Sequence, residues 1–374
     1  MKKNSERKPE WIPEHADPKL FTTSVVSGVD FGADSSDASI SARPRPRRRS
    51  LSLDDYRSGI LAGDRTVLAR AITLIESSNP DHFKLSQELL TSLLPETGRS
   101  FRIGITGVPG AGKSSFIETF GSMLCDKFGK KVAVLAVDPS SSITGGSVLG
   151  DKTRMENLSR NPRAFIRPSP SGGMLGGVAR KSRESMLLCE AAGFDVILIE
   201  TVGVGQSEVS VRSMTDFFLL LQLAVQGDDL QGIKKGVIEL ADGILVNKCD
   251  GNLVEKSKLK QAELAGVLHF LSAPVPDWRP FCLTCSALTG EGVEDFWLEL
   301  QKYRQTTSAN GYFQRRRAEQ NAQWFTSLLE SEVLRRFFAS DGVAAAVEHY
   351  KKLVEESKVN PTSAAYNVIE EFSK

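Results

Sequence analysis

The residues from Gly107 to Ser115 have the composition of a phosphate-binding loop. Every position of the pattern G-x-x-x-x-G-K-[ST] is filled, an apolar stretch at 101–106 precedes the loop, and a stretch of helical character follows it. In such loops backbone N–H groups bind the phosphates, Lys113 reaches the β- and γ-phosphates, and the Ser114 hydroxyl can ligate Mg²⁺. A simple glycine turn would leave Lys113 unexplained. We therefore expect a nucleoside triphosphate site formed by Gly107, Val108, Pro109, Gly110, Ala111, Gly112, Lys113, Ser114 and Ser115.

A second motif concerns the base. The sequence Asn-Lys-Cys-Asp at 247–250 closes an apolar run at 241–246. The Asp250 carboxylate can accept from the ring N–H and the exocyclic amine of guanine, whereas adenine offers no matching pair of donors. Asn and Asp are also common where a strand ends in a turn. A Ser-Ala turn at 286–287 after another short apolar segment supports GTP and GDP, because its N–H groups could meet the guanine carbonyl. The predicted base site is Asn247, Lys248, Asp250, Ser286, Ala287 and Leu288.

Three acidic residues could surround the γ-phosphate. Glu200 ends the apolar segment 194–199 and is followed by a turn whose Gly203 N–H could touch the γ-phosphate, while Asp138 ends a second apolar segment and Asp151 lies in a Gly-rich polar loop. A strand-end Asp can instead cap a helix or lie in a turn. The longer arm of Glu200 suits a water-mediated contact with the metal. The candidate Mg²⁺ or water ligands are Ser114, Asp138, Asp151 and Glu200.

Several long motifs resemble one family. They are VDPSSS at 137–142, LGDKTRM at 149–155, ETVGVGQSE at 200–208 and QGDDLQGIKKG at 226–236. Together with the phosphate loop they resemble the methylmalonyl-CoA mutase-associated GTPases of the MeaB or ArgK type, over all but about the first 50 residues.

The resemblance implies a GTPase chaperone that couples nucleotide state to loading, protection or repair of an adenosylcobalamin-dependent acyl-CoA mutase. It also implies that Lys113, Asp138, Asp151 and Glu200 act in hydrolysis. The loop with Asp228 and Lys234 resembles a third switch that rearranges when the mutase binds, which adds Lys234 to the catalytic candidates.

Two other functions stay open. One is a nucleotide-dependent kinase linked to amino-acid transport, which would pass phosphate to a protein. The other is a GTPase that delivers metal, although the four histidines are scattered and Cys282-x-x-Cys285 has no second Cys pair. This Cys pair is more typical of a buried strand edge.

The alternation of apolar and helical segments predicts an α/β fold. We expect a P-loop NTPase domain at 101–305 with a mostly parallel, doubly wound sheet, preceded by a helical segment at 51–100, where Asp64 and Asn79 are expected to cap helices. Residues 1–50 are polar, carry an arginine cluster and lack sustained periodicity, so they are expected to be a disordered tail.

Residues 306–374 form the last region. Apolar side chains recur at three- and four-residue steps along one helical face, namely Trp324, Phe325, Leu328, Leu329, Val333, Leu334, Phe337 and Phe338. This stripe must pack within its own chain or on a second subunit, and the family resemblance favours a helical arm that forms a homodimer. The basic run 312–317 before it is expected to be solvated rather than to bind nucleic acid.

The composition fits a globular enzyme of the cytoplasm. The chain has 374 residues and a formal net charge of +1, so no global field attracts nucleic acid, and the longest apolar run is far too short to span a membrane. Five cysteines, an odd number, fit a reducing compartment, and the N-terminus has neither an apolar signal segment nor the acid-poor composition of a transit peptide.

Overall fold

The computed structural model describes residues 51–137, 155–168, 175–201, 207–224, 235–271 and 275–372. The chain divides into two units, residues 1–50 and residues 51–374, and every described residue belongs to the second. The divisions proposed within 51–374 stay predictions, and helix α11 (Val293–Ala309) continues across residue 305.

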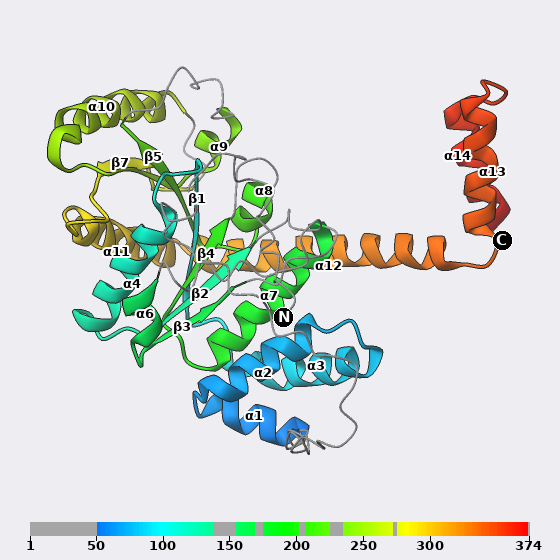
Figure 1. The fold of residues 1–374 in the computed structure, drawn as a ribbon, viewed down its shortest axis with the longest axis horizontal. Helices are drawn as coiled ribbons and strands as arrows, with labels where there is room; N and C mark the ends of the chain where they lie inside the picture. The colour runs from blue at the N-terminus through cyan, green and yellow to red at the C-terminus, as the bar shows by residue number, and fades with distance from the viewer. Residues whose placement is uncertain are drawn as a thin grey trace, which may run out of the picture. The chain divides into compact units, whose positions relative to one another are not determined.

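A parallel sheet forms the centre of this unit (Figure 1). In the described part of the chain it has seven strands in the order β3-β2-β4-β1-β5-β6-β7, and every neighbouring pair is parallel. The strands are β1 (Phe101–Gly107), β2 (Val132–Val137), β3 (Ala164–Arg167), β4 (Val196–Thr201), β5 (Phe217–Leu223), β6 (Gly243–Asn247) and β7 (Phe281–Thr284). Strands β1, β4 and β6 are buried at every position, as expected for strands covered on both faces.

Helices cover both faces of the sheet (Figure 1). One face packs against α4 (Lys113–Asp126), α6 (Glu156–Arg160) and α11, around a cluster of aromatic rings that includes Phe116, Phe120 and Phe296. The other face packs against α7 (Leu175–Ala191), α8 (Ser207–Arg212), α9 (Lys235–Leu240) and α10 (Val254–Phe270). The predicted doubly wound α/β fold is confirmed.

Three helices before the sheet pack on α7. They are α1 (Leu53–Leu61), α2 (Arg65–Glu76) and α3 (Pro80–Leu93), followed by a short 3-10 turn, η2 (Leu94–Glu96). Asp64 accepts from the N–H groups of the first turn of α2, and Asn79 does so for α3, which begins with a proline. Both predicted helix caps are therefore confirmed, and the apolar faces of these helices extend the core on that side.

The C-terminal region is helical. It consists of α12 (Tyr312–Ala339), α13 (Val343–Glu355) and α14 (Pro361–Phe372), and α13 and α14 pack against each other. The apolar stripe on the distal part of α12 stays uncovered within the described chain: Phe325 is 66% exposed, and Leu329, Val333, Leu334 and Phe338 are all more than half exposed. Among the described residues nothing covers this distal part, whereas Trp324 at the start of the predicted stripe lies under the Arg183 guanidinium of α7.

The beginning of α12 is anchored at the amino ends of the strands. The Arg317 guanidinium donates to both carboxylate oxygens of Asp216 at 2.7 and 2.6 Å and to the Ser100 carbonyl at 2.6 Å. Arg316, which is 8% exposed, donates to the Thr215 carbonyl at 3.0 Å, and Gln320 donates to the same carbonyl at 2.8 Å. We call Arg316, Arg317 and Gln320 the α12 anchor.

The prediction that the run 312–317 is solvated is therefore wrong for two of its arginines. Asp216 and Asp242 directly precede β5 and β6, and their carboxylates are buried. Arg317 pairs with Asp216, and Arg316 lies 3.7 Å from Asp242. A charge run on one helix gave no indication of these acidic partners, which are about 75 to 100 residues earlier in the chain.

The cysteines are free thiols, all five of them in described positions. Cys282 lies on the edge strand β7, and both it and Cys285 are buried, which confirms the expectation of a buried strand edge. No helix in the described ranges combines the length and apolar composition needed to cross a membrane.

Candidate nucleotide-binding site

The phosphate-binding loop connects the carboxyl end of β1 to the first residue of α4. Two of its glycines are required by close approaches. A Cβ on Gly107 would lie 2.5 Å from the Leu221 carbonyl oxygen of β5, and a Cβ on Gly112, whose φ is +84°, would lie 2.7 Å from the Asn247 amide nitrogen. The loop therefore lies against β5 and against the predicted base-recognition motif.

Lys113 and Ser114 begin α4 and project toward the carboxyl ends of β1 and β4. The Lys113 ammonium donates to the Gly107 carbonyl at 2.8 Å, and the Ser114 hydroxyl donates to Glu200 Oε1 at 3.0 Å. Burial lowers the pKa of Lys113 from its ordinary value, and the carboxylates of Glu200 and Glu208 oppose that shift. A partly buried ammonium beside the backbone of the loop is suited to bind phosphate oxygens.

Glu200 lies next to the loop because of the strand register. In β4 it pairs with Ile105 of β1 and Ala136 of β2, and it is only 4% exposed. Behind it, the Thr201 hydroxyl donates to the Thr106 hydroxyl at 3.0 Å and so joins the ends of β4 and β1. A serine hydroxyl and a carboxylate in contact are oxygen ligands of the kind that Mg²⁺ takes, so these residues fit the ion that the sequence predicts.

Asn247 connects three segments that are far apart in the sequence. Its Nδ2 donates to the Ala111 carbonyl of the phosphate-binding loop at 2.8 Å, and its Oδ1 accepts from the Ala287 N–H at 3.0 Å. The side chain is buried, with 1% exposure. A single amide therefore fixes the predicted base-recognition turn relative to the predicted phosphate site.

Asp250 and Ser286 are in direct contact. The Ser286 hydroxyl donates to Asp250 Oδ2 and accepts from the Thr289 N–H at 3.1 Å. Between Asn247 and Asp250, Lys248 has a φ of +61°, a conformation that non-glycine residues rarely adopt. The motif Asn-Lys-Cys-Asp is thus held by hydrogen bonds to residues 285–287, and one of these bonds, from Ser286, fixes the carboxylate of Asp250.

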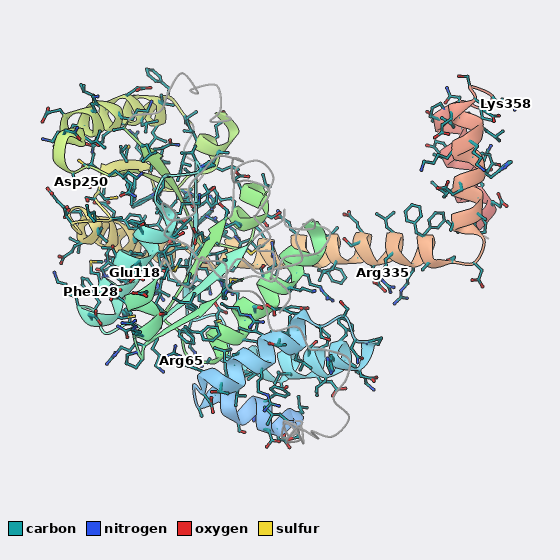
Figure 2. The ribbon with its side chains drawn as sticks, viewed as in Figure 1. Arg65, Glu118, Phe128, Asp250, Arg335 and Lys358 are labelled. Atoms are coloured by element: carbon teal, nitrogen blue, oxygen red, sulfur yellow. The ribbon has the colours of Figure 1, made fainter. Side chains whose placement is uncertain are left out.

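A cavity of about 380 Å³ lies between α4 and these two turns. Glu118 and Asp250, which are labelled in Figure 2, both line it. Seven of the residues predicted from the sequence line this cavity, namely Gly112, Ser115, Asn247, Lys248, Asp250, Ala287 and Leu288. The volume and the mixed lining are typical of a small-molecule site.

Sequence reasoning missed three lining residues, Glu118, Thr119 and Leu253. Helical spacing could have found two of them, because Glu118 and Thr119 follow Ser115 by three and four residues and so share its face of α4. Glu118 also accepts from the Asn157 N–H at 2.8 Å and so caps α6. Leu253 lies in the short turn η4 (Gly251–Leu253) and has no comparable sequence signal.

Four predicted residues, Asp138, Asp151, Gly203 and Lys234, lie outside the described residues. Their roles near the γ-phosphate stay predictions. Among the residues that the structure does describe, no group of three or more His, Cys, Asp or Glu side chains is placed to hold a metal ion.

Comparison with known proteins shows the family to which this chain belongs. The sequence matches the family described as methylmalonyl Co-A mutase-associated GTPase MeaB over residues 68–342. It is 51% identical to a putative GTPase of Caulobacter vibrioides, over 86% of this chain and 98% of that protein. It is 42% identical to the mouse protein named methylmalonic aciduria type A homolog, mitochondrial, over 86% of this chain and 79% of that protein.

A solved structure agrees with the sequence matches. The crystal structure of a LAO/AO transport system kinase superposes with a TM-score of 0.71 at 38% identity and covers 87% of this chain and all of that one. The family match over residues 68–342 spans the phosphate-binding loop, Asn247 and Asp250. The chain therefore belongs to the methylmalonyl-CoA mutase-associated GTPase family of the MeaB type.

Proposed function

We propose that this protein hydrolyses GTP to GDP and phosphate and thereby controls the loading, protection or reactivation of an adenosylcobalamin-dependent acyl-CoA mutase. The observation that carries the proposal is membership of the mutase-associated family over residues 68–342. The mouse relative, named after methylmalonic aciduria, supports the same direction.

The site geometry supports guanine nucleotides as ligands. Asn247 fixes the Ala287 turn and the phosphate-binding loop together, and the Asp250 carboxylate lines the adjoining cavity. A carboxylate there would accept from both the ring N–H and the 2-amino group of guanine, which adenine cannot satisfy.

In the proposed reaction a water molecule attacks the γ-phosphorus of GTP, and the bond from that phosphorus to the β–γ bridging oxygen breaks. Lys113 would hold the β- and γ-phosphate oxygens and neutralise their charge. Mg²⁺, held by Ser114 and Glu200 and assisted by Asp138 and Asp151, would supply further charge neutralisation. Catalysis of this kind depends on positioning, which is supported by the hydrogen bonds that α4 donates to β1 and β4 and that Asn247 of β6 donates to the phosphate-binding loop.

We further propose that two copies of this chain form the active assembly. The support is the uncovered apolar stripe on distal α12, which would bury its five exposed side chains against a partner subunit.

A cytoplasmic location is also proposed, and it is supported by the five free thiols.

A kinase linked to amino-acid transport is the second candidate function. It is favoured by the description of the superposed structure as a LAO/AO transport system kinase. A kinase would transfer the γ-phosphate to a protein, whereas a GTPase releases it as inorganic phosphate. Quantifying free phosphate and labelled protein from γ-labelled GTP separates the two.

The mutase proposal is tested by affinity capture from native extract with the protein loaded with GDP or with a non-hydrolysable GTP analogue. We expect a cobalamin-dependent acyl-CoA mutase to be retained to different extents in the two states. Retention of no such mutase in either state would contradict the proposed partner.

Lys234 is proposed as the residue through which the partner accelerates hydrolysis, as its family motif implies. We expect Lys234→Ala to leave the slow intrinsic rate nearly unchanged and to remove most of the stimulation by the mutase, measured by phosphate release. Equal stimulation of the variant and the wild type would exclude this role.

A further inference from the structure

The backbone of Ala287 is held from two sides. Its N–H donates to Asn247 Oδ1 at 3.0 Å, and its carbonyl accepts from the Thr119 hydroxyl at 2.6 Å. These two partners come from β6 and α4, so the turn is fixed to both walls of the cavity.

The contact with Thr119 has a consequence for the next residue. The Ala287 carbonyl and the Leu288 N–H belong to the same planar trans peptide, so fixing the carbonyl also fixes the direction of that N–H. Leu288 lines the cavity, and within the described ranges no residue accepts from its N–H. Since the Ala287 N–H is already donated to Asn247, the Leu288 N–H is the amide that this turn can offer to a ligand.

We propose that Thr119 is a positioning residue for guanine recognition: its hydroxyl orients the Ala287–Leu288 peptide toward the 6-carbonyl of the bound base. The inference rests on the proposed binding of guanine nucleotides and goes beyond it, because no phosphate-loop or base motif includes this position. The Thr119 side chain does not contact the base itself. It acts through the peptide.

The two halves of base recognition can be separated by choice of ligand. Guanine and hypoxanthine both have the 6-carbonyl that the turn recognises, whereas adenine has an amine there. Asp250 recognises the ring N–H and the 2-amino group, and hypoxanthine lacks the latter. Loss of the Thr119 contact should therefore affect GDP and IDP alike and leave ADP unaffected.

The test measures dissociation constants for GDP, IDP and ADP by calorimetry with Thr119→Val, which keeps the shape of the side chain and removes the hydroxyl. We expect GDP and IDP to bind about 3- to 10-fold more weakly, the effect of one hydrogen bond, with ADP unchanged. Thr119→Ser, which retains the hydroxyl, should restore the wild-type constants. If Thr119→Val does not fold, Thr119→Ala removes the same hydroxyl without a branched side chain.

A matched control is Thr91→Val on α3, where the hydroxyl bonds a carbonyl of its own helix, that of Gln87 at 2.8 Å, and lies outside the cavity. All three constants should stay at their wild-type values in this variant. An unchanged GDP constant in Thr119→Val, an equal loss for ADP, or failure of Thr119→Ser to restore binding would each overturn the inference. A wild-type protein that binds ADP as tightly as GDP would instead contradict guanine recognition itself.

Discussion

Individual side chains in the candidate site each hold two segments at once. Asn247 bonds to the phosphate-binding loop and to the Ala287 turn, and Ser114 bonds to Glu200 at the end of a different strand. Such residues set the distance between the predicted phosphate and base sites. Their substitution should therefore change ligand binding more than it changes the fold.

Asp250→Asn tests the recognition of the base. An asparagine amide can donate to the 2-oxygen of xanthine, so we expect the variant to prefer xanthosine triphosphate over GTP. The binding free energy for GTP should weaken by roughly 2 to 4 kcal/mol, as for a mispaired buried polar group. A competition assay with both nucleotides measures the preference, and an unchanged preference for GTP would contradict the assignment of Asp250.

Those parts of the site that depend on contiguous sequence motifs could be predicted from the sequence, and those that depend on distant contacts could not. The phosphate-binding loop and the 247–250 turn are contiguous motifs, and the structure brings Gly112, Asn247, Asp250 and Ala287 together as expected. Thr119 was not predicted because its partner, the Ala287 carbonyl, is 168 residues away in the sequence. Its helical spacing from Ser115 places Thr119 on the same face of α4 as Ser115 but gives no indication of this contact.

At the level of elements, the amino ends of the strands form a second polar centre. The α12 anchor attaches the C-terminal helix there, at the opposite end of the strands from the candidate nucleotide site. Arg183 of α7 adds to it by donating to the Gln320 carbonyl at 3.2 Å and to the Ser213 carbonyl at 2.8 Å. The helix is thus fixed by charged and polar contacts as well as by apolar packing.

Arg317→Ala tests the strength of this attachment. The Asp216 carboxylate, whose side chain is 2% exposed, would lose its close guanidinium partner. We expect the free energy of unfolding to fall by about 3 kcal/mol, the usual effect of removing one member of a buried ion pair. Urea denaturation followed by circular dichroism measures this change.

The matched control is Arg335→Ala on the exposed part of α12, labelled in Figure 2. Arg335 pairs only with the exposed Glu332 on its own helix among described residues, so no measurable change is expected. Equal losses of stability in the two variants would show that the α12 anchor contributes nothing specific.

Two truncations test the roles of the two parts of α12. Ending the chain after Thr326 keeps the α12 anchor and removes most of the exposed stripe, so we expect a monomer that still binds nucleotide. Ending it after Gly311 also removes Tyr312 and Phe313, which pack on the core, and leaves Asp216 and Asp242 without Arg316 and Arg317.

We therefore expect the shorter chain to be unstable. Light scattering gives the oligomeric state, and titration with GDP reports the site. A dimer after truncation at Thr326 would mean that the stripe is not the subunit contact, and a stable shorter chain would mean that the anchor is dispensable.

For the molecule as a whole, the sequence predicted the α/β fold more completely than it predicted the packing of the C-terminal region. The alternating apolar strands and capped helices carry local signals, as at Asp64 and Asn79. Burial of Arg316 and Arg317 depends on long-range charge pairs that no local pattern reveals. The apolar stripe on distal α12 stays uncovered among the described residues, and the spacing of its side chains does not say what would cover it.

We propose that the cobalamin-dependent acyl-CoA mutase whose loading, protection or reactivation this protein would control also accelerates its GTPase reaction. The most direct measurement is the rate of phosphate release from GTP by the full-length protein, alone and with a purified mutase of that class. We predict slow release by the protein alone and a several-fold acceleration when the mutase is added. A protein that hydrolyses GTP but is not accelerated by any cobalamin-dependent acyl-CoA mutase would contradict the claim.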